Sequence, residues 1–183
     1  MDTKMKDWFY IRTNKHIELL KKQAQKILKS DIVKDRKKFI NRIDVHDKSK
    51  FEPPELEPYL YITWKYKCER DNIPFSVPKN IEEMMHEATE HHVKNNPHHP
   101  EFWSTQKGSF INTNDRDKPS VLVDASKMDD EAIIEMVCDW KAVSEEKQTN
   151  IRDWAKMNIG IRWDFTDKQI KLINKCMDFF ESE

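Results

Sequence analysis

The stretch IIEMVCDW, residues 133–140, places large apolar side chains at the spacing of one helix face, and polar residues 126–130 ahead of it can cap a helix. Its apolar positions are Ile133, Ile134, Met136, Val137 and Trp140. One carboxylate, Asp139, lies among them. A carboxylate on such a face requires a salt-bridge partner or an ion if it is buried. The stretch therefore predicts a core helix that also supplies a polar group to a site.

Further helices are predicted on both sides of this stretch by apolar residues that recur three and four positions apart. They are a segment capped by Thr13 or Asn14, residues 35–46, an aromatic-rich segment after Pro58, residues 81–93, residues 148–158 and residues 166–180. The chain has two glycines, which gives little support to the tight turns of an all-β fold or to a glycine-rich phosphate loop. We therefore expect an all-α protein.

The length of 183 residues is that of one ordinary domain, so residues 1–183 are expected to fold as a single unit. Residues 101–123 mix Gly, Ser, Asn, Asp and Pro with isolated apolar residues. This composition is typical of irregular structure. We expect a long loop or lid there, within the helical domain.

Composition also bounds the setting of the protein. The formal net charge of -1 gives no indication of a nucleic-acid partner, and no apolar run reaches the 18 residues of a membrane-spanning helix. Three cysteines, far apart in the sequence and odd in number, favour a reduced environment. These features predict a cytoplasmic protein, in the host cytoplasm if the source is viral. They leave its oligomeric state open.

The histidines are unevenly distributed, because five of the seven fall between positions 86 and 99. Imidazole and carboxylate ligands together suit divalent Mn, Fe, Zn, Co or Ni. His86 lies on a different helix face from His91, so it is expected to be outside the site. For His91, His92, His98 and His99, the alternative interpretations are a polar loop without metal and a metal contact between molecules.

His46 and Asp47 are adjacent in the segment VHDKSKF, residues 45–51. Consecutive side chains of a helix point about 100° apart, so both can reach one ion only near a helix end or from its inner face. The segment is predicted to follow a helix directly. A helix terminus with a capping aspartate is the alternative that involves no metal.

The motif HDKSK resembles the HDxxK form of the HD superfamily of metal-dependent phosphohydrolases, with Lys50 matching its basic residue. An earlier histidine, His16, and the later Asp139 complete the order of that superfamily. The segments VHDKSKF, HHVKNNPHHPEFW (residues 91–103) and EMVCDW (residues 135–140) are also similar to those of a family of functionally uncharacterised phage and bacterial proteins.

The HD resemblance implies a single HD-domain-like helical bundle that binds one or two divalent transition-metal ions. It assigns the first ion to His16, His46, Asp47 and Asp139. A second ion would be bridged by Asp47 and held by the middle histidines, for which we favour His92 and either His98 or His99. His91 stays open as the alternative to its neighbour His92.

The activity implied by the resemblance is hydrolysis of a nucleotide or related phosphoester, a small-molecule substrate, through metal-activated water. Asp47, Lys50 and Glu90 are the expected catalytic residues. The residues expected to bind substrate are Lys48, Lys50, Lys94 and Trp103. Glu101 is a further candidate to accept a proton or orient a histidine, and Trp140 could stack on a nucleobase.

Two other functions fit the same residues. A di-iron HD-type oxygenase would use this ligand set for oxygen-dependent oxidation of a small polyol or phosphonate. A non-catalytic interaction protein would use the metal to fasten its helices together, and metal removal would then unfold it.

Overall fold

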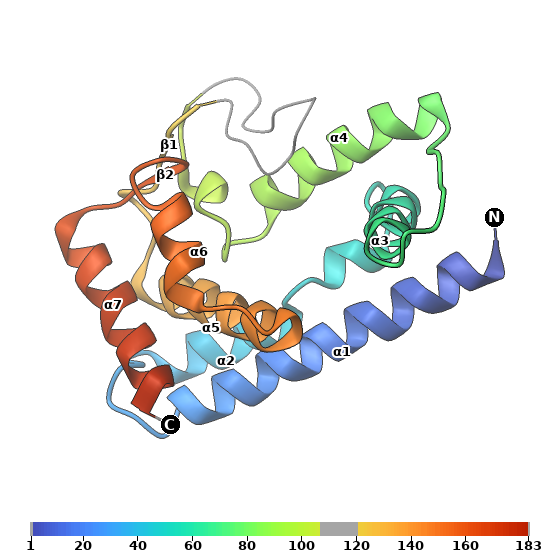
Figure 1. Cartoon of the computed structure of the whole chain (residues 1–183). Coiled ribbons are helices and arrows are strands. Elements are labelled where there is room, and N and C mark those ends of the chain that lie inside the picture. The colour runs from blue at the N-terminus through green and yellow to red at the C-terminus, as the bar shows by residue number, and fades with distance from the viewer. Residues whose placement is uncertain (1, 107–120, 183) are drawn as a thin grey trace.

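The computed structural model describes residues 2–106 and 121–182, and this part of the chain is predominantly helical (Figure 1). Its α-helices are α1 (Thr3–Ile27), α2 (Arg36–Val45), α3 (Leu56–Arg70), α4 (Lys79–Asn95), α5 (Asp130–Lys147), α6 (Ile151–Asn158) and α7 (Asp167–Ser182). The short elements are the 3-10 helices η1 (Lys48–Phe51) and η2 (Pro100–Trp103) and the strands β1 (Val123–Asp124) and β2 (Trp163–Asp164). The expected all-α class is confirmed.

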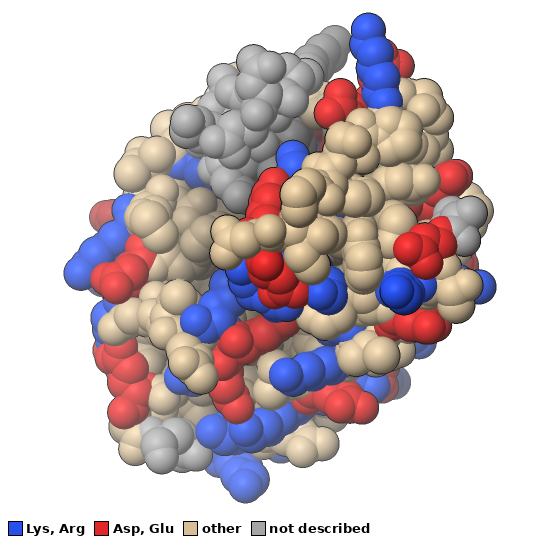
Figure 2. Space-filling model, turned by 45° about the vertical axis from the view of Figure 1, so that its right-hand side comes forward, with Lys and Arg blue, Asp and Glu red and all other residues tan. Residues whose placement is uncertain are grey.

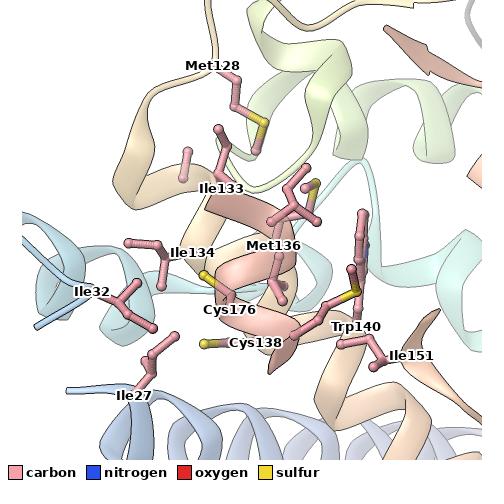
Figure 3. Packing of buried hydrophobic residues seen from close by; sticks show 14 of the residues in the cluster. Ile27, Ile32, Met128, Ile133, Ile134, Met136, Cys138, Trp140, Ile151 and Cys176 are labelled. Atoms are coloured by element: carbon pink, nitrogen blue, oxygen red, sulfur yellow. The ribbon is translucent and has the colours of Figure 1, made fainter. Parts of the chain in front are cut away.

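Helix α5 lies at the centre of the main apolar core and contacts α1, α2, α6 and α7. Asp129 caps its first turn by accepting a hydrogen bond from the Ala132 backbone N–H. In Figure 3, Ile134 and Cys138 of α5 lie beside Ile27 and Ile32 from the chain's first third. The stretch from residue 133 to residue 140 thus forms the predicted core helix.

A second, smaller apolar cluster joins α1 to α3 and α4. Phe9 of α1 is fully buried there against the aromatic rings of Tyr10 and Phe51, and Ala88 of α4 belongs to the same cluster. The two clusters fix the two ends of the long helix α1. His16 lies between these ends and contacts Asp139 of α5.

The two strands form a parallel pair in which Val123 is opposite Trp163. Strand β1 also contacts η2, where the buried carboxylate of Glu101 accepts a hydrogen bond from Trp163 Nε1 at 2.9 Å. This small unit ties the segment after α4 to the segment between α6 and α7.

One predicted boundary is wrong. Helix α1 begins at Thr3, capped by the Asp2 side chain, and not at a cap on Thr13 or Asn14. Met5 and Phe9 continue the buried face of α1 toward the N-terminus, so Thr13 is a buried residue inside the helix. The helix therefore extends about three turns upstream of the expected cap.

The other helix predictions agree with the structure. Asp35 caps α2, Pro58 lies in the first turn of α3, and the remaining helices overlap the expected ranges. Most of the loop or lid expected at 101–123 falls on residues 107–120, outside the described residues. Its first residues belong to η2, and Val123 begins β1.

Two surface properties follow from the described part of the chain. None of its helices combines the length and the apolar character needed to cross a membrane. On the face shown in Figure 2, basic and acidic side chains are interspersed, as the near-zero net charge leads one to expect.

Candidate metal centre

The His46–Asp47 pair lies at the end of α2, where the backbone turns sharply. Helix α2 ends at Val45, His46 has extended backbone angles, and Asp47 adopts the left-handed conformation with φ of 59°. Aspartate and asparagine tolerate this conformation better than most residues. The turn allows two consecutive side chains to enter one site, as the sequence required.

Asp47 is the centre of this site and is almost completely buried. Its Oδ1 lies 3.2 Å from His92 Nε2 and 3.8 Å from the Nε2 atoms of both His46 and His98. Its Oδ2 lies 3.9 Å from His16 Nε2 and 2.6 Å from Lys50 Nζ. Four imidazoles from different parts of the chain therefore surround one carboxylate.

Asp139 of α5 reaches the same site. Its Oδ1 lies 2.9 Å from His16 Nε2 and 4.0 Å from His46 Nε2. The side chain is 19% exposed, whereas that of Asp47 is 1% exposed. Asp139 thus closes the cluster on the side of α5 and is more accessible than Asp47.

A second carboxylate of α5, Glu135, lies behind two of the imidazoles. Its Oε1 is 2.9 Å from His46 Nδ1 and 3.5 Å from His98 Nδ1. A carboxylate at Nδ1 favours the tautomer whose Nε2 carries a lone pair. Glu135 therefore orients both rings so that Nε2 faces Asp47.

Glu55, just before α3, makes the equivalent contacts on the side of α4. It is fully buried, and its two oxygens lie 2.8 Å from His91 Nδ1 and His92 Nδ1. Ser49 Oγ donates a further hydrogen bond to Glu55 at 3.0 Å. Of the two histidines, only His92 is buried and directed toward Asp47, because the His91 side chain is 39% exposed.

Buried atoms at the centre of the cluster are suited to a cation. Among the described residues, none makes a hydrogen bond to His46 Nε2, His92 Nε2 or Asp47 Oδ1, although all three atoms are buried. Leaving such atoms unpaired costs free energy, and a coordinated ion would satisfy them together. The donor set of imidazole nitrogens and carboxylate oxygens fits a divalent transition metal.

The potential ligands fall into overlapping groups whose ligand atoms lie within 4.8 Å of one another. They are His16, His46 and Asp47; His46, His98 and Asp139; and His92, His98 and His99. Buried His/Asp clusters that could hold a metal ion are therefore present on both sides of Asp47. The sequence left open which of His98 and His99 belongs to the site, and both lie at the cluster.

Electrostatics hold the carboxylates of the cluster in their charged form. Burial by itself would raise the pKa of Asp47, but Lys50, His46 and His92 together lower it well below its usual range. Burial likewise opposes ionisation of Asp139, yet the hydrogen bond and charge of His16 lower its pKa. Both are therefore negatively charged at neutral pH, as metal ligands must be.

The protonation states of Glu135 and His99 also suit a metal site. Burial would raise the pKa of Glu135, but hydrogen bonds from His46 and His98 lower it to about 2. Burial, together with the neighbouring His98 and His92, holds the pKa of His99 well below its usual value. His99 is therefore a neutral imidazole at neutral pH.

A cavity of about 440 Å³ opens onto the cluster. Its lining includes Lys50 and six residues of the cluster: His16, Asp47, His92, His98, His99 and Asp139. Residues of α5, α6 and β2 line its other walls. The candidate centre is thus accessible to a small molecule.

Other residues that the sequence suggested lie away from this cavity. Glu90 pairs with Lys94 at 2.6 Å along α4, and Lys48 is exposed on η1. Trp103 donates a hydrogen bond to the Pro97 carbonyl and packs on the main core. These residues and His91 are not among those lining the cavity, and neither is His86, which was expected outside the site.

Sequence reasoning missed the two supporting glutamates. Glu135 lies one helical turn before Asp139 in the same apolar stretch, so the argument for a buried carboxylate applied to it equally. Glu55 lies in the irregular segment EPPELEP, residues 52–58, where no periodicity indicates which side chains are buried. Trp140 does line the cavity, but Glu101 is used by Trp163 and Arg162 instead of by a histidine.

Comparison with protein-family models assigns the chain to a family, but the activity of that family is unknown. A model described as a family of unknown function, DUF5662, matches residues 5–179. The chain belongs to this family. No curated protein and no solved structure matches the chain significantly. The DUF5662 match spans the whole candidate metal centre, from His16 to Asp139.

Proposed function

We propose that the protein is a metal-dependent phosphohydrolase of the HD type that acts on a nucleotide or related phosphoester. The observation that carries this proposal is the position of Asp47, which lies within 4 Å of four imidazole nitrogens and is paired with Lys50 at the end of a cavity. The resemblance of residues 46–50 to the HDxxK motif supports it.

The residues that would hold the metal are those with ligand atoms directed into the cluster. His16, His46, Asp47 and Asp139 form one side, and His92, His98 and His99 form the other. A divalent ion bound here supplies Lewis-acid chemistry, because it lowers the pKa of a coordinated water and neutralises charge on a phosphate.

The charges around the cavity favour an anionic ligand. Apart from the two aspartates of the cluster, the basic residues Arg12, Lys147 and Arg162 line it against one acidic residue, Asp153. Lys50 adds a fourth positive charge next to the cluster. The lining thus has four basic residues against three aspartates, and a bound divalent ion would neutralise the two aspartates of the cluster. With metal bound, this balance favours an anionic ligand such as a phosphoester.

Lys50 is the residue that we expect to touch the phosphate. Its ammonium group lies 2.6 Å from Asp47 Oδ2 and 5.3 Å from the centre of the Tyr59 ring, and its side chain is 14% exposed at the cavity. From this position it can neutralise a phosphate oxygen next to the metal ligands. Glu90, which we expected to take part in catalysis, lies outside the cavity, and the proposal assigns it no role.

The test is a panel of phosphomonoesters and phosphodiesters, assayed with wild-type protein in the presence and absence of Mn, Fe, Zn, Co or Ni. Lys50→Gln removes the proposed phosphate contact, and Lys48→Gln is the matched control on the same short helix η1. We expect metal-dependent turnover that falls about 100- to 1000-fold in Lys50→Gln and stays unchanged in Lys48→Gln. Inactivity on the whole panel with metal bound, or equal activity of both variants, would contradict the proposal.

A di-iron oxygenase is the second candidate, and the presence of potential ligands on both sides of Asp47 favours it as well. Iron content and oxygen consumption distinguish the two reactions. Protein loaded with iron that consumes oxygen with a polyol or phosphonate, and hydrolyses no phosphoester, would favour oxidation. Equal hydrolysis with redox-inert Zn would favour the phosphohydrolase.

A further inference from the structure

Beyond the metal cluster, part of the cavity wall is apolar, and this part begins on α5. Asp139, Trp140, Val143 and Lys147 all line the cavity and recur at the spacing of one helix face. A helix rises about 1.5 Å per residue, so Val143 lies about 6 Å and Lys147 about 12 Å beyond Asp139 along the axis. Apolar side chains therefore follow directly after the last carboxylate of the cluster.

Helix α6 and strand β2 supply the rest of this wall. Trp154 and Met157, three residues apart on α6, line the cavity, as does Trp163 of β2. Trp163 stacks on Trp140 with ring centres 5.6 Å apart and planes 11° apart. Met157 is 60% exposed, so a ligand in the cavity would cover apolar surface that now faces solvent. We call Trp140, Val143, Trp154, Met157 and Trp163 the aromatic wall.

We propose that the aromatic wall binds a flat, apolar ring system of a phosphoester whose phosphate lies at the His/Asp cluster. This inference rests on the proposed function and specifies its substrate. The proposed substrate is a phosphoester with an aromatic ring, and α6 contributes to the specificity for that ring.

The choice of a ring over a sugar or a bare phosphate follows from the chemistry of the wall. Indole faces bind flat rings by stacking, and methionine adapts its unbranched chain to their edges. Trp140 and Trp163 are nearly buried and stack on each other, so the half-buried Trp154 is the indole that a ligand ring would contact. A small polyhydroxylated group would leave the apolar side chains of the wall uncovered, whereas a flat ring would remove their surface from water. The cavity of about 440 Å³ is within the range that encloses a drug-sized molecule, ample for a phosphate with one bicyclic ring.

The experiment measures binding, so it does not depend on turnover. Two non-hydrolysable probes, naphthylmethylphosphonate and methylphosphonate, share the anionic group and differ in the ring. Their dissociation constants are measured by calorimetry on metal-loaded wild type, on Trp154→Ala and Met157→Ala, and on the control Trp64→Ala. Trp64 is also a half-buried tryptophan, but it contacts Lys67 on α3 and does not line the cavity.

We expect wild type and Trp64→Ala to bind the naphthyl probe about tenfold more tightly than methylphosphonate. Trp154→Ala should lose most of this preference and Met157→Ala part of it, with methylphosphonate affinity unchanged in both. Equal affinity of wild type for the two probes, or a preference that survives in both wall variants, would overturn the inference.

The outcome is distinguishable from failure of the proposed function. A ring preference that depends on Trp154, in a protein that hydrolyses no phosphoester, would retain the aromatic wall and reject hydrolysis. Hydrolysis of sugar and aryl phosphates with equal efficiency would retain the proposed function and reject the aromatic wall.

Discussion

Helix α5 takes part in two buried regions of opposite character. Ile133, Ile134 and Cys138 belong to the apolar core between α1, α2 and α7, whereas Glu135 and Asp139 belong to the His/Asp cluster. The core buries side chains that need only close packing. The cluster buries nitrogen and oxygen atoms that make no hydrogen bond within the described structure, at His46, Asp47 and His92. The difference indicates that the core stabilises the fold, while the cluster has the groups that could hold a metal ion.

The largest expected effect is the loss of metal from Asp47→Asn. Asparagine keeps the shape and tolerates the left-handed backbone at this position, but it removes the charge that four imidazoles and Lys50 face. We expect bound metal to fall to background in elemental analysis, with the helical circular dichroism of wild type. The same variant with full metal content would show that the cluster does not bind through Asp47.

Ile133→Ala in the core should have the opposite consequence: it should lower stability and leave metal binding intact. Ile133 is fully buried, so its truncation leaves a cavity and should lower the free energy of unfolding by about 2–5 kcal/mol. Urea denaturation of metal-free protein measures this loss. Under native conditions the variant should still bind metal at the wild-type stoichiometry. If metal removal alone unfolded wild type, the ion would have the structural role of a non-catalytic interaction protein.

A smaller effect is expected for Glu135→Gln. The amide keeps the shape of Glu135 but weakens its hold on His46 and His98, and changes of this kind typically reduce metal affinity about 10- to 100-fold. Competition with a chromogenic chelator measures the affinity. Glu131→Gln, on the same helix but in contact with the Asp35 backbone and Lys38, is the control that should keep wild-type affinity.

The smallest effect concerns acid stability of the metal-free protein. Burial opposes ionisation of Glu135, but its hydrogen bonds from His46 and His98 lower its pKa from 4.5 to about 2. A lowered carboxyl pKa contributes stability that is complete above pH 4.5 and is lost as the pH falls toward 2. Urea denaturation between pH 2 and 6 should show a shallower decline in Glu135→Gln. Parallel curves for the two proteins would contradict this contribution.

The same contrast explains how much could be predicted from the sequence. Apolar spacing indicates helices because core packing repeats with the helical period, and so the core helix around Ile133 was predictable. The N-terminal part of α1 was missed because Phe9 lies in the run WFYI, residues 8–11, whose adjacent apolar residues obscure the helical period. Phe9 also belongs to the smaller cluster with α3 and α4. That contact depends on tertiary packing.

Part of the candidate site could also be predicted from the sequence. His16, His46, Asp47 and Asp139 could be named because their order resembles that of the HD superfamily. Asp139 was also a candidate because a buried carboxylate in an apolar helix needs a partner. His92, and not its neighbour His91, is buried at the cluster because of how α4 packs against Glu55. This packing is tertiary, so no local sequence pattern indicates it. Glu90, Lys94 and Trp103 are near the histidines in sequence, but the structure directs them elsewhere.

The most direct test of the central claim is to locate the ion itself. Crystals of wild-type protein grown with Co²⁺ would be measured with X-rays on either side of the cobalt absorption edge. We predict an anomalous peak within coordination distance of Asp47 and of Nε2 atoms from the surrounding histidines, His46 and His92 among them. A fully ordered cluster with no peak, or cobalt bound only at histidines outside the cluster such as His86, would contradict the claim that this is a metal centre.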